Sequence, residues 1–302
     1  MPSLSPYYNP GATIDLGDQA FQVEAILREG KGVMQALKVR KVTKKMKTKN
    51  ILDEENAFVL KIFRNESQSA VANRAFEHWK KLREVLRPSG FPDMHHCDNH
   101  VVVTEFIEGT VAERIEKLNS KTISRIVLDI AEQIDVLLQH EMAHGDVKPA
   151  NIVRKTGDQG APRSKLIDMD YLAPLGDIRI GNPPLRFGTP DFMSPEHIEG
   201  RYVRGTDMHA LGKSALRLVG LAYRIDTKAM LAQYGILDFL TRAPEPEQRR
   251  LAARQLFRNI ARKDGENEKQ SERLVSFITQ ATAYYPEERP QSREEVKRIL
   301  AI

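Results

Sequence analysis

The chain has 302 residues, of which 41% are apolar and 29% charged, and its formal net charge is +5. These proportions predict a folded protein with a sizeable core and exclude a fibrous or largely disordered chain. No apolar run reaches the ~18 residues that a membrane-spanning helix needs, and the first residues lack the pattern of a secretion signal. Because the only cysteine, Cys97, has no partner for a disulfide, we expect a cytoplasmic protein in a reducing compartment.

The first third of the chain has the pattern of a small antiparallel sheet. Short runs rich in β-branched and aromatic residues alternate with glycine-containing or lysine-rich connections, in FQVEAIL (21–27), MQALKV (34–39) and FVLKIF (58–63). A helix is expected over 69–86, because its apolar residues recur at helical spacing and end before Pro88. A buried strand, VVVTEFIEG (101–109), then ends in a turn.

The rest of the chain is mainly helical in pattern, with helices expected at 124–140, 210–223, 251–262, 271–285 and 292–301. The sequence therefore predicts an α+β fold, in which a small β-rich lobe with one main helix precedes a larger helical lobe. We expect an N-terminal extension (1–20), a first lobe (21–104), a hinge (105–109) and a second lobe (110–302).

Two acidic motifs follow the helix expected at 124–140. The first, HGDVKPANIV (144–153), contains Asp146, Lys148 and Asn151, and the second, KLIDMD (165–170), contains Asp168 and Asp170. Phosphoryl transfer requires such groups, because a carboxylate must orient the attacking hydroxyl and oxygen ligands must hold Mg²⁺ against the phosphates. A turn that uses Asp and Asn only for backbone reasons is the alternative.

Further motifs follow in a fixed order: FGTPDFMSPE (187–196), TDMHALG (206–212) and PEERP (286–290). Together with the acidic motifs, they resemble eukaryotic-type Ser/Thr protein kinases over roughly residues 21 to 301. The resemblance implies the bilobal protein kinase fold, with a kinase domain at 21–302, ATP and Mg²⁺ as cofactors, and Ser or Thr of protein substrates as acceptors.

The resemblance also assigns roles in the helical lobe. Asp146 would be the catalytic base and Lys148 would neutralise charge on the transferred phosphoryl group. Asn151 and Asp168 would ligate Mg²⁺, although Asp170 is an alternative for the metal aspartate.

Other positions in this lobe would be structural by the same resemblance. Asp207 would hold the backbone of the catalytic loop, and Arg289 would pair with Glu196. Thr189 would contact both the catalytic aspartate and the nearby lysine.

In the small lobe, the resemblance places the nucleotide's phosphates under a glycine-rich loop. Gly30 and Gly32 are present, but Gln35 stands where a third glycine is usual. Lys61 would bind the phosphates, with Glu77 on the following helix as its ion-pair partner.

The adenine pocket would lie along the strand at 101–109. Thr104 would form its back, and Glu105 to Ile107 would offer backbone groups to the base. The remaining walls would come from apolar side chains that an ordinary core also uses: Leu37, Val59 and Ile167.

Two other functions fit parts of the pattern. The H-G-D and I-D-M-D sequences also resemble the aminoglycoside and choline kinase class, which does not explain Lys148 or the segment around Thr189. A pseudokinase that only binds partners is favoured by Gln35, by Asp170 and by the weak match of Glu77 to the family pattern. The retained residues argue against it: Lys61, Asp146, Lys148, Asn151 and Asp168.

Gly145 stands where most members of the family carry an arginine that pairs with a phosphorylated activation segment. Between Asp168 and Thr189 the chain has no other serine or threonine, and it contains the pair Pro183-Pro184. We therefore expect activity without phosphorylation of this segment, and no gain from Gly145→Arg.

The resemblance implies protein substrates and no nucleic-acid partner. Two basic stretches are candidate contacts for an acidic partner, the loop at 40–49 and the helix at 250–262, although a solvated charged face is the alternative.

Overall fold

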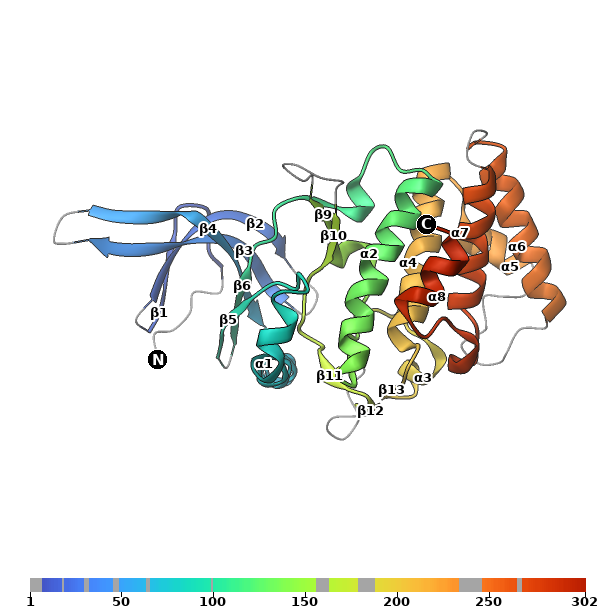
Figure 1. The fold of residues 1–302 in the computed structure, drawn as a ribbon. Helices are drawn as coiled ribbons and strands as arrows, with labels where there is room; N and C mark the ends of the chain where they lie inside the picture. Colours follow the sequence, from blue (N-terminus) through green and yellow to red (C-terminus); the bar gives the residue numbers. More distant parts are fainter. Residues whose placement is uncertain are drawn as a thin grey trace. The chain divides into compact units, whose positions relative to one another are not determined.

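The computed structural model describes residues 7–17, 19–29, 33–45, 49–63, 66–98, 100–155, 163–178, 188–233, 246–264 and 268–302. The chain forms two compact units, one of residues 1–88 and 92–107 and the other of residues 89–91 and 108–302 (Figure 1). The first unit is built on a sheet and the second on helices, so the expected α+β class is confirmed.

The first unit contains a six-stranded antiparallel sheet with the strand order β1-β2-β3-β4-β6-β5. The helix α1 (Glu66–Leu86) packs on β4 and β5. The hairpin of β3 and β4 is longer than the other strands and extends beyond them (Figure 1). The strands are β1 (Thr13–Leu16), β2 (Gln19–Glu29), β3 (Val33–Lys45), β4 (Lys49–Phe63), β5 (Met94–Asp98) and β6 (Val101–Glu105).

One face of this sheet carries the unit's apolar core, because alternate residues of a strand point to the same side. The core contains residues of five strands: Ile14, Phe21, Val23, Leu37, Val39, Phe58, Leu60, Ile62, Val101 and Val103. Ile14 comes from β1, so the segment expected to be an extension supplies a strand of the sheet and a core residue.

The second unit is organised around two long helices, α2 (Ser120–Gln139) and α4 (Thr206–Tyr223), which contact each other and α7 (Glu268–Ala281) (Figure 1). Asn119 caps α2 by accepting a hydrogen bond of 2.8 Å from the Thr122 N–H. The remaining helices are α3 (Pro195–Ile198), α5 (Thr227–Gln233), α6 (Pro246–Ala261) and α8 (Arg293–Leu300).

Short strands and 3₁₀ turns between the helices carry the acidic motifs. The strands are β7 (Thr110–Val111), β8 (Met142–Ala143), β9 (Ile152–Lys155), β10 (Arg163–Leu166), β11 (Ala173–Pro174), β12 (Gly176–Asp177) and β13 (Arg201–Tyr202). The 3₁₀ turns are η1 (Ala112–Arg114), η2 (Pro149–Asn151), η3 (Pro190–Phe192) and η4 (Pro286–Glu288).

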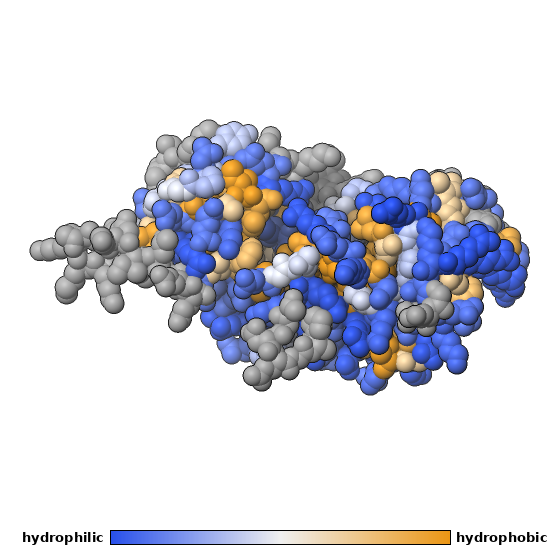
Figure 2. All heavy atoms as spheres, turned by 90° about the horizontal axis from the view of Figure 1, so that it is seen from above, coloured by the Kyte–Doolittle hydropathy of each residue, from blue (hydrophilic) through white to orange (hydrophobic). Residues whose placement is uncertain are grey.

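The described surface is mostly hydrophilic on the face drawn in Figure 2, with apolar side chains in separate areas. This distribution agrees with the high content of charged residues. Among the helices of the described residues, none is long and apolar enough to cross a membrane.

Candidate active site

The loop between β8 and η2 is held by the N-terminus of α4. Asp207, in the first turn of α4, accepts hydrogen bonds from the backbone N–H groups of His144 (2.6 Å) and Gly145 (3.0 Å). All three residues are buried. The expected contact between Asp207 and the loop is therefore present, and the loop's backbone is fixed just before Asp146.

Three side chains surround the Asp146 carboxylate. Lys148 Nζ donates to Oδ2 (2.5 Å), the Thr189 hydroxyl donates to Oδ1 (2.7 Å), and Asn151 Nδ2 donates to Oδ2 (3.0 Å). Lys148 Nζ also donates to the Thr189 hydroxyl at 2.7 Å. Residues far apart in the sequence thus converge on one buried carboxylate, as the resemblance to protein kinases implied for Thr189.

Asp168 lies near the Asp146 loop, because its charge acts on His144 in that loop. Burial lowers the pKa of His144, while the charges of Asp207, Asp146 and Asp168 oppose this effect. His144 Nδ1 accepts from the Asp146 N–H (3.3 Å), so Nε2 carries the proton and donates to the Ile167 carbonyl (3.1 Å). A neutral His144 therefore joins the strand end before Asp168 to the Asp146 loop.

The backbone at Asp168 is strained, with φ +70, a left-handed conformation that costs a non-glycine residue free energy and is found at functional sites. Asp170 has no positive φ, and the charges named as acting on the pKa of His144 include Asp168. Both observations favour Asp168 over Asp170 as the aspartate of the site.

The oxygen atoms at this site suit a hard divalent cation. Asn151 uses its amide nitrogen twice, to Asp146 Oδ2 and to the Asp146 carbonyl (2.9 Å), so its amide oxygen is directed away from these contacts. An amide oxygen and the Asp168 carboxylate are ligands that Mg²⁺ accepts when substrate phosphates and water complete its shell. Asn151 and Asp168 therefore fit the metal role that the sequence suggests.

Gly145 has no room for a side chain. Its φ is +80, and a Cβ atom there would lie 2.0 Å from the Tyr202 hydroxyl oxygen and 2.7 Å from Tyr202 Cζ. Tyr202 is buried and packs edge-on against His197, with 4.9 Å between ring centroids. Burial and the nearby charges of Asp207 and Asp146 raise the pKa of Tyr202, so its hydroxyl stays neutral. Tyr202 thus fills the space beside Gly145.

The start of the segment between Asp168 and Glu196 is paired with other parts of the second unit. The strand β11 pairs with β8, and β12 pairs with β13. Between and after them, Leu175 N–H donates to the Glu141 carbonyl (2.8 Å) and Ile178 N–H to the Gly200 carbonyl (2.9 Å). Ile178 also forms an apolar cluster with Ala143 and Tyr202. Backbone pairing and packing therefore hold residues 173–178.

The end of the segment is held by a buried ion pair. Arg289 donates from both terminal nitrogens to Glu196, at 2.7 and 3.0 Å. Burial raises the pKa of Glu196, but the hydrogen bonds and charge of Arg289 outweigh it and lower this pKa to about 2. The pair that the resemblance implies is formed, and the lowered pKa keeps Glu196 ionised at neutral pH.

In the first unit, the strand register decides which candidates share a face. Lys61 lies opposite Ala36 on one side and Val102 on the other, and Val59 lies opposite Thr104. Directly opposed residues point to the same side of a sheet. Lys61, Val59, Thr104 and Ala36 therefore lie on one face.

Leu37 corrects the expectation from the sequence. It lies opposite Leu60 and is fully buried in the apolar core, on the face away from Lys61. Side chains alternate along a strand, so a shift of one residue exchanges the two faces. The position on the Lys61 face belongs to Ala36, because a register shift between Val33 and Gln35 moves the later residues of β3 by one position relative to β4, and the sequence pattern gives no sign of this shift.

Glu77 also differs from the expectation. Its carboxylate pairs with Lys80 at 2.5 Å and is 61% exposed, so it is not the partner of Lys61. The helical repeat places Glu77 opposite the buried residues of α1, which are Ser69, Val71, Ala72, Ala75, Trp79 and Leu86. That buried face carries no carboxylate.

Two hinge residues have their backbone N–H groups occupied. Glu105 N–H donates to the Asp93 carbonyl (2.7 Å), and Phe106 N–H donates to the Ala57 carbonyl (3.0 Å). Ile107 follows directly and is buried. Gly30 and Gly32 lie outside the described residues.

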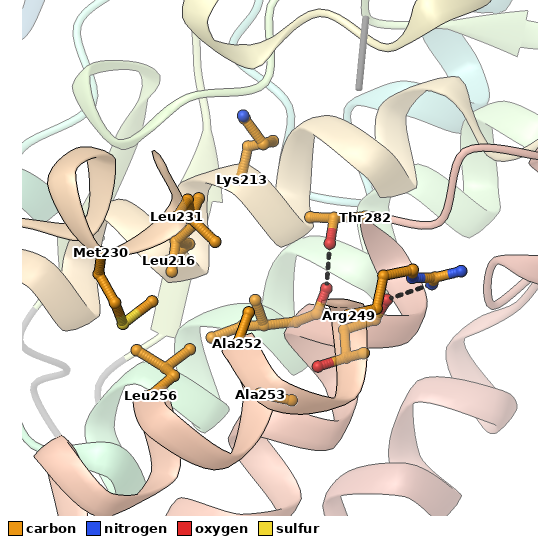
Figure 3. Close-up of a pocket in the computed structure, with 11 residues that line it drawn as sticks. Lys213, Leu216, Met230, Leu231, Arg249, Ala252, Ala253, Leu256 and Thr282 are labelled. Atoms are coloured by element: carbon orange, nitrogen blue, oxygen red, sulfur yellow. Dashed lines mark hydrogen bonds between the residues drawn. The ribbon is translucent and has the colours of Figure 1, made fainter. Parts of the chain in front are cut away.

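A separate pocket lies among α4, α5, α6 and α7 and shares no residue with the acidic site (Figure 3). Its volume is about 50 Å³, and its walls are mainly apolar. Arg249 closes one side by donating to the Thr279 carbonyl at 3.0 Å. Leu216, Met230, Ala252, Ala253 and Leu256 are among its lining residues.

The protein kinase domain family matches residues 22–299, nearly the whole chain, and the chain belongs to this family. Similar proteins include serine/threonine-protein kinase D of Synechocystis (25% identity, 57% of this chain and 33% of the relative) and serine/threonine-protein kinase 17A of Oryctolagus cuniculus (28% identity, 64% and 44%). The chain thus spans between a third and a half of these relatives.

Solved structures show the same fold. The PknI kinase domain of Mycobacterium tuberculosis is similar with a TM-score of 0.57 at 16% identity, covering 98% of both chains. The kinase PK-1 of the Cydia pomonella granulovirus is similar with a TM-score of 0.60 at 17% identity, covering 93% of this chain and 95% of that one. The protein kinase fold expected from the sequence is therefore confirmed.

Proposed function

We propose that the protein transfers the γ-phosphoryl group of ATP to serine or threonine hydroxyls of protein substrates, with Asp146 as the catalytic base. The observation that carries the proposal is the convergence of Lys148, Asn151 and Thr189 on the Asp146 carboxylate. A carboxylate held this way has one fixed orientation toward an attacking hydroxyl. Lys148 supplies a positive charge beside it for the transferred phosphoryl group.

Asn151 and Asp168 are proposed to hold Mg²⁺, which supplies charge neutralisation at the phosphates when it is bound. Lys61 is proposed to bind the phosphates from the face that it shares with Ala36 and Val59. Thr104, the backbone of Glu105 and Ile107, and Ile167 are proposed to surround the adenine.

The test compares Asp146→Asn with Asp168→Ala. Loss of the base should lower kcat by about 10²–10⁴-fold and leave the Kd for MgATP unchanged. Loss of the metal ligand should weaken Mg²⁺-dependent ATP binding as well. Glu199→Gln, which changes an exposed carboxylate of the same unit, is the control. Wild-type transfer by both site variants would contradict the assignment.

The acceptor is tested in the same assay with a protein mixture, an aminoglycoside and choline. The segment that contains Thr189 supports a protein acceptor, because the Thr189 hydroxyl is bound by both Asp146 and Lys148. We expect label on serine and threonine of protein. Turnover of a small alcohol without labelled protein would favour a small-molecule kinase.

A binding protein without catalysis is a second candidate, favoured by the pairing of Glu77 with Lys80 instead of Lys61. ATP binding without phosphate transfer to any protein, including the chain itself, would support it. The intact cluster around Asp146 is the reason to prefer the enzyme.

We also propose that activity does not require phosphorylation of the activation segment. Gly145 removes the arginine that would need a phosphate, and Tyr202 fills the space beside it. The pairing of β11 with β8 and of β12 with β13 supports the segment by packing instead. Pro183 and Pro184, expected to contribute, lie outside the described residues.

This proposal is tested by comparing initial rates of phosphatase-treated and autophosphorylated enzyme, with mass spectrometry of residues 168–196. Equal rates are expected. A large loss of rate that follows removal of a phosphate from these residues would refute the proposal.

An acidic partner is proposed for the basic face of α6, where Arg254 and Arg258 are exposed. The basic stretch at 40–49 is the alternative position. Charge reversal of Arg254 and Arg258 should weaken binding to polyglutamate in a salt-dependent way, whereas charge reversal of Lys41 should not. The opposite result would assign the contact to the stretch at 40–49.

A cytoplasmic location is proposed from the single cysteine.

A further inference from the structure

Gln35 is a buried polar residue in a position where the family usually has glycine. It lies on β3 opposite Glu29 of β2, and only 1% of its surface is exposed. On its other side, Gln35 lies opposite Ile62 of β4, which belongs to the apolar core. Gln35 therefore points to the core face of the sheet. Lys61 points to the other face, and the Gln35 side chain therefore takes no space on the side proposed for ATP.

The Gln35 side chain is hydrogen-bonded to the N-terminal segment. Its Oε1 accepts from the Tyr8 N–H (2.8 Å), and its Nε2 donates to the Tyr8 carbonyl (3.2 Å) and to Glu29 Oε1 (2.9 Å). A side-chain amide that binds both backbone groups of one residue replaces a strand partner for that residue. Gln35 thus joins Tyr8 to both strands of the hairpin.

The N-terminal segment continues along β2 from this contact. Gly11 N–H donates to the Val23 carbonyl (2.8 Å), Val23 N–H donates to the Ala12 carbonyl (2.9 Å), and β1 then pairs with β2. Tyr8, Ala12 and Leu16 pack on the apolar core. The segment is therefore attached at several points on the face opposite Lys61.

We propose that residues 8–16 brace the hairpin of β2 and β3 from behind, with Gln35 as the positioning residue, and thereby increase the affinity for MgATP. The inference rests on the proposed ATP-binding function. A hairpin that is already ordered loses less conformational entropy when a nucleotide binds beneath it. Displacement of the N-terminal segment would then lower ATP affinity, which gives this segment a regulatory role.

The test measures the Kd for MgATP by calorimetry and amide hydrogen exchange of residues 22–29 and 33–39. Gln35→Leu and deletion of residues 1–12 should each raise the Kd roughly fivefold, the effect of about one net hydrogen bond, and should speed exchange in the hairpin. The combined variant should be no worse than the deletion alone, because the deletion already removes the Tyr8 contact that Gln35→Leu breaks. The kcat at saturating ATP should change less than the KM for ATP.

The control is Val39→Ala, on the same strand and face, which should lower thermal stability but change the Kd less than twofold. Wild-type Kd and exchange in Gln35→Leu, or additive losses in the combined variant, would overturn the brace. If the wild type binds no MgATP, the proposed function fails, and hydrogen exchange alone then decides whether the segment orders the hairpin.

Discussion

Asp146 is held so tightly that the residues around it tolerate little change. The two residues before it donate their backbone N–H groups to Asp207, and its carboxylate accepts hydrogen bonds from three side chains. Gly188 adds a close approach, because a Cβ there would lie 2.8 Å from the Gly145 carbonyl oxygen. The absence of a side chain at Gly188 thus allows the segment that carries Thr189 to lie close to the Asp146 loop.

Gly145→Ala should therefore lower both stability and kcat. The left-handed backbone alone costs about 1–2 kcal/mol for alanine, and the overlap with Tyr202 adds to this. We expect an unfolding free energy lower by about 3 kcal/mol, measured in urea. Gly17→Ala is the matched control, since its φ is +64 with nothing within 4 Å of the new Cβ. Equal losses in the two variants would show that Tyr202 does not limit this position.

The same geometry changes the expectation for Gly145→Arg. The sequence suggests no gain in activity, and the structure adds that the arginine has no space beside Tyr202. We therefore expect the arginine variant to lose stability as well as to gain no activity.

Among the elements, α1 differs from the expectation that Glu77 pairs with Lys61. Because Glu77 faces solvent, Glu77→Ala should change kcat/KM by less than about threefold, as exposed ion pairs contribute little. Trp79→Ala, two residues further on the buried face, should cost about 3–5 kcal/mol of stability. A loss of activity of 100-fold in Glu77→Ala, without loss of stability, would restore Glu77 as the partner of Lys61.

The pocket between α4 and α7 is a defect in the packing of the helical unit, and filling it should stabilise the protein. Ala253→Val adds apolar atoms to its wall (Figure 3), and we expect a gain of about 1 kcal/mol in unfolding free energy. Ala229→Val, at an exposed position of α5, is the control and should give no gain in unfolding free energy. A loss in Ala253→Val would mean that the pocket cannot accept the added volume.

At the scale of the whole molecule, the order of the motifs was the strongest information in the sequence about which residues lie together. It placed Asp146, Lys148, Asn151 and Thr189 together before any distance was known, because each motif has one position in the fold. The order of motifs did not reveal strand register or helix rotation. The register shift between Val33 and Gln35 left no mark in the pattern, and Glu77 lies at an acceptable spacing but on the exposed side of α1. Tyr202 had no signal of its own, since its role comes from a contact with a glycine.

The pair of Glu196 and Arg289 joins segments 93 residues apart, so its ionisation should affect the stability of the whole helical unit. The pKa of Glu196 is about 2 in the folded protein and near 4.5 when unfolded, so the unfolded state binds the proton first as pH falls. The stabilisation is complete above about pH 4.5 and is lost as pH falls toward 2. Its full size is about 3 kcal/mol.

Urea unfolding between pH 2.5 and 6 should therefore show a steeper loss of stability in the wild type than in Glu196→Gln, which has no carboxylate to protonate. Arg289→Ala should cost about 3–5 kcal/mol at neutral pH, because it leaves the buried Glu196 carboxylate without its partner. It should be more harmful than Glu196→Gln, because it also removes the hydrogen bonds of Arg289 to the Ala283, Gly205 and Tyr284 carbonyls. Parallel pH profiles for the wild type and Glu196→Gln would show that other carboxylates control acid unfolding. The buried ion pair would then serve only to align α3 with the turn before α8.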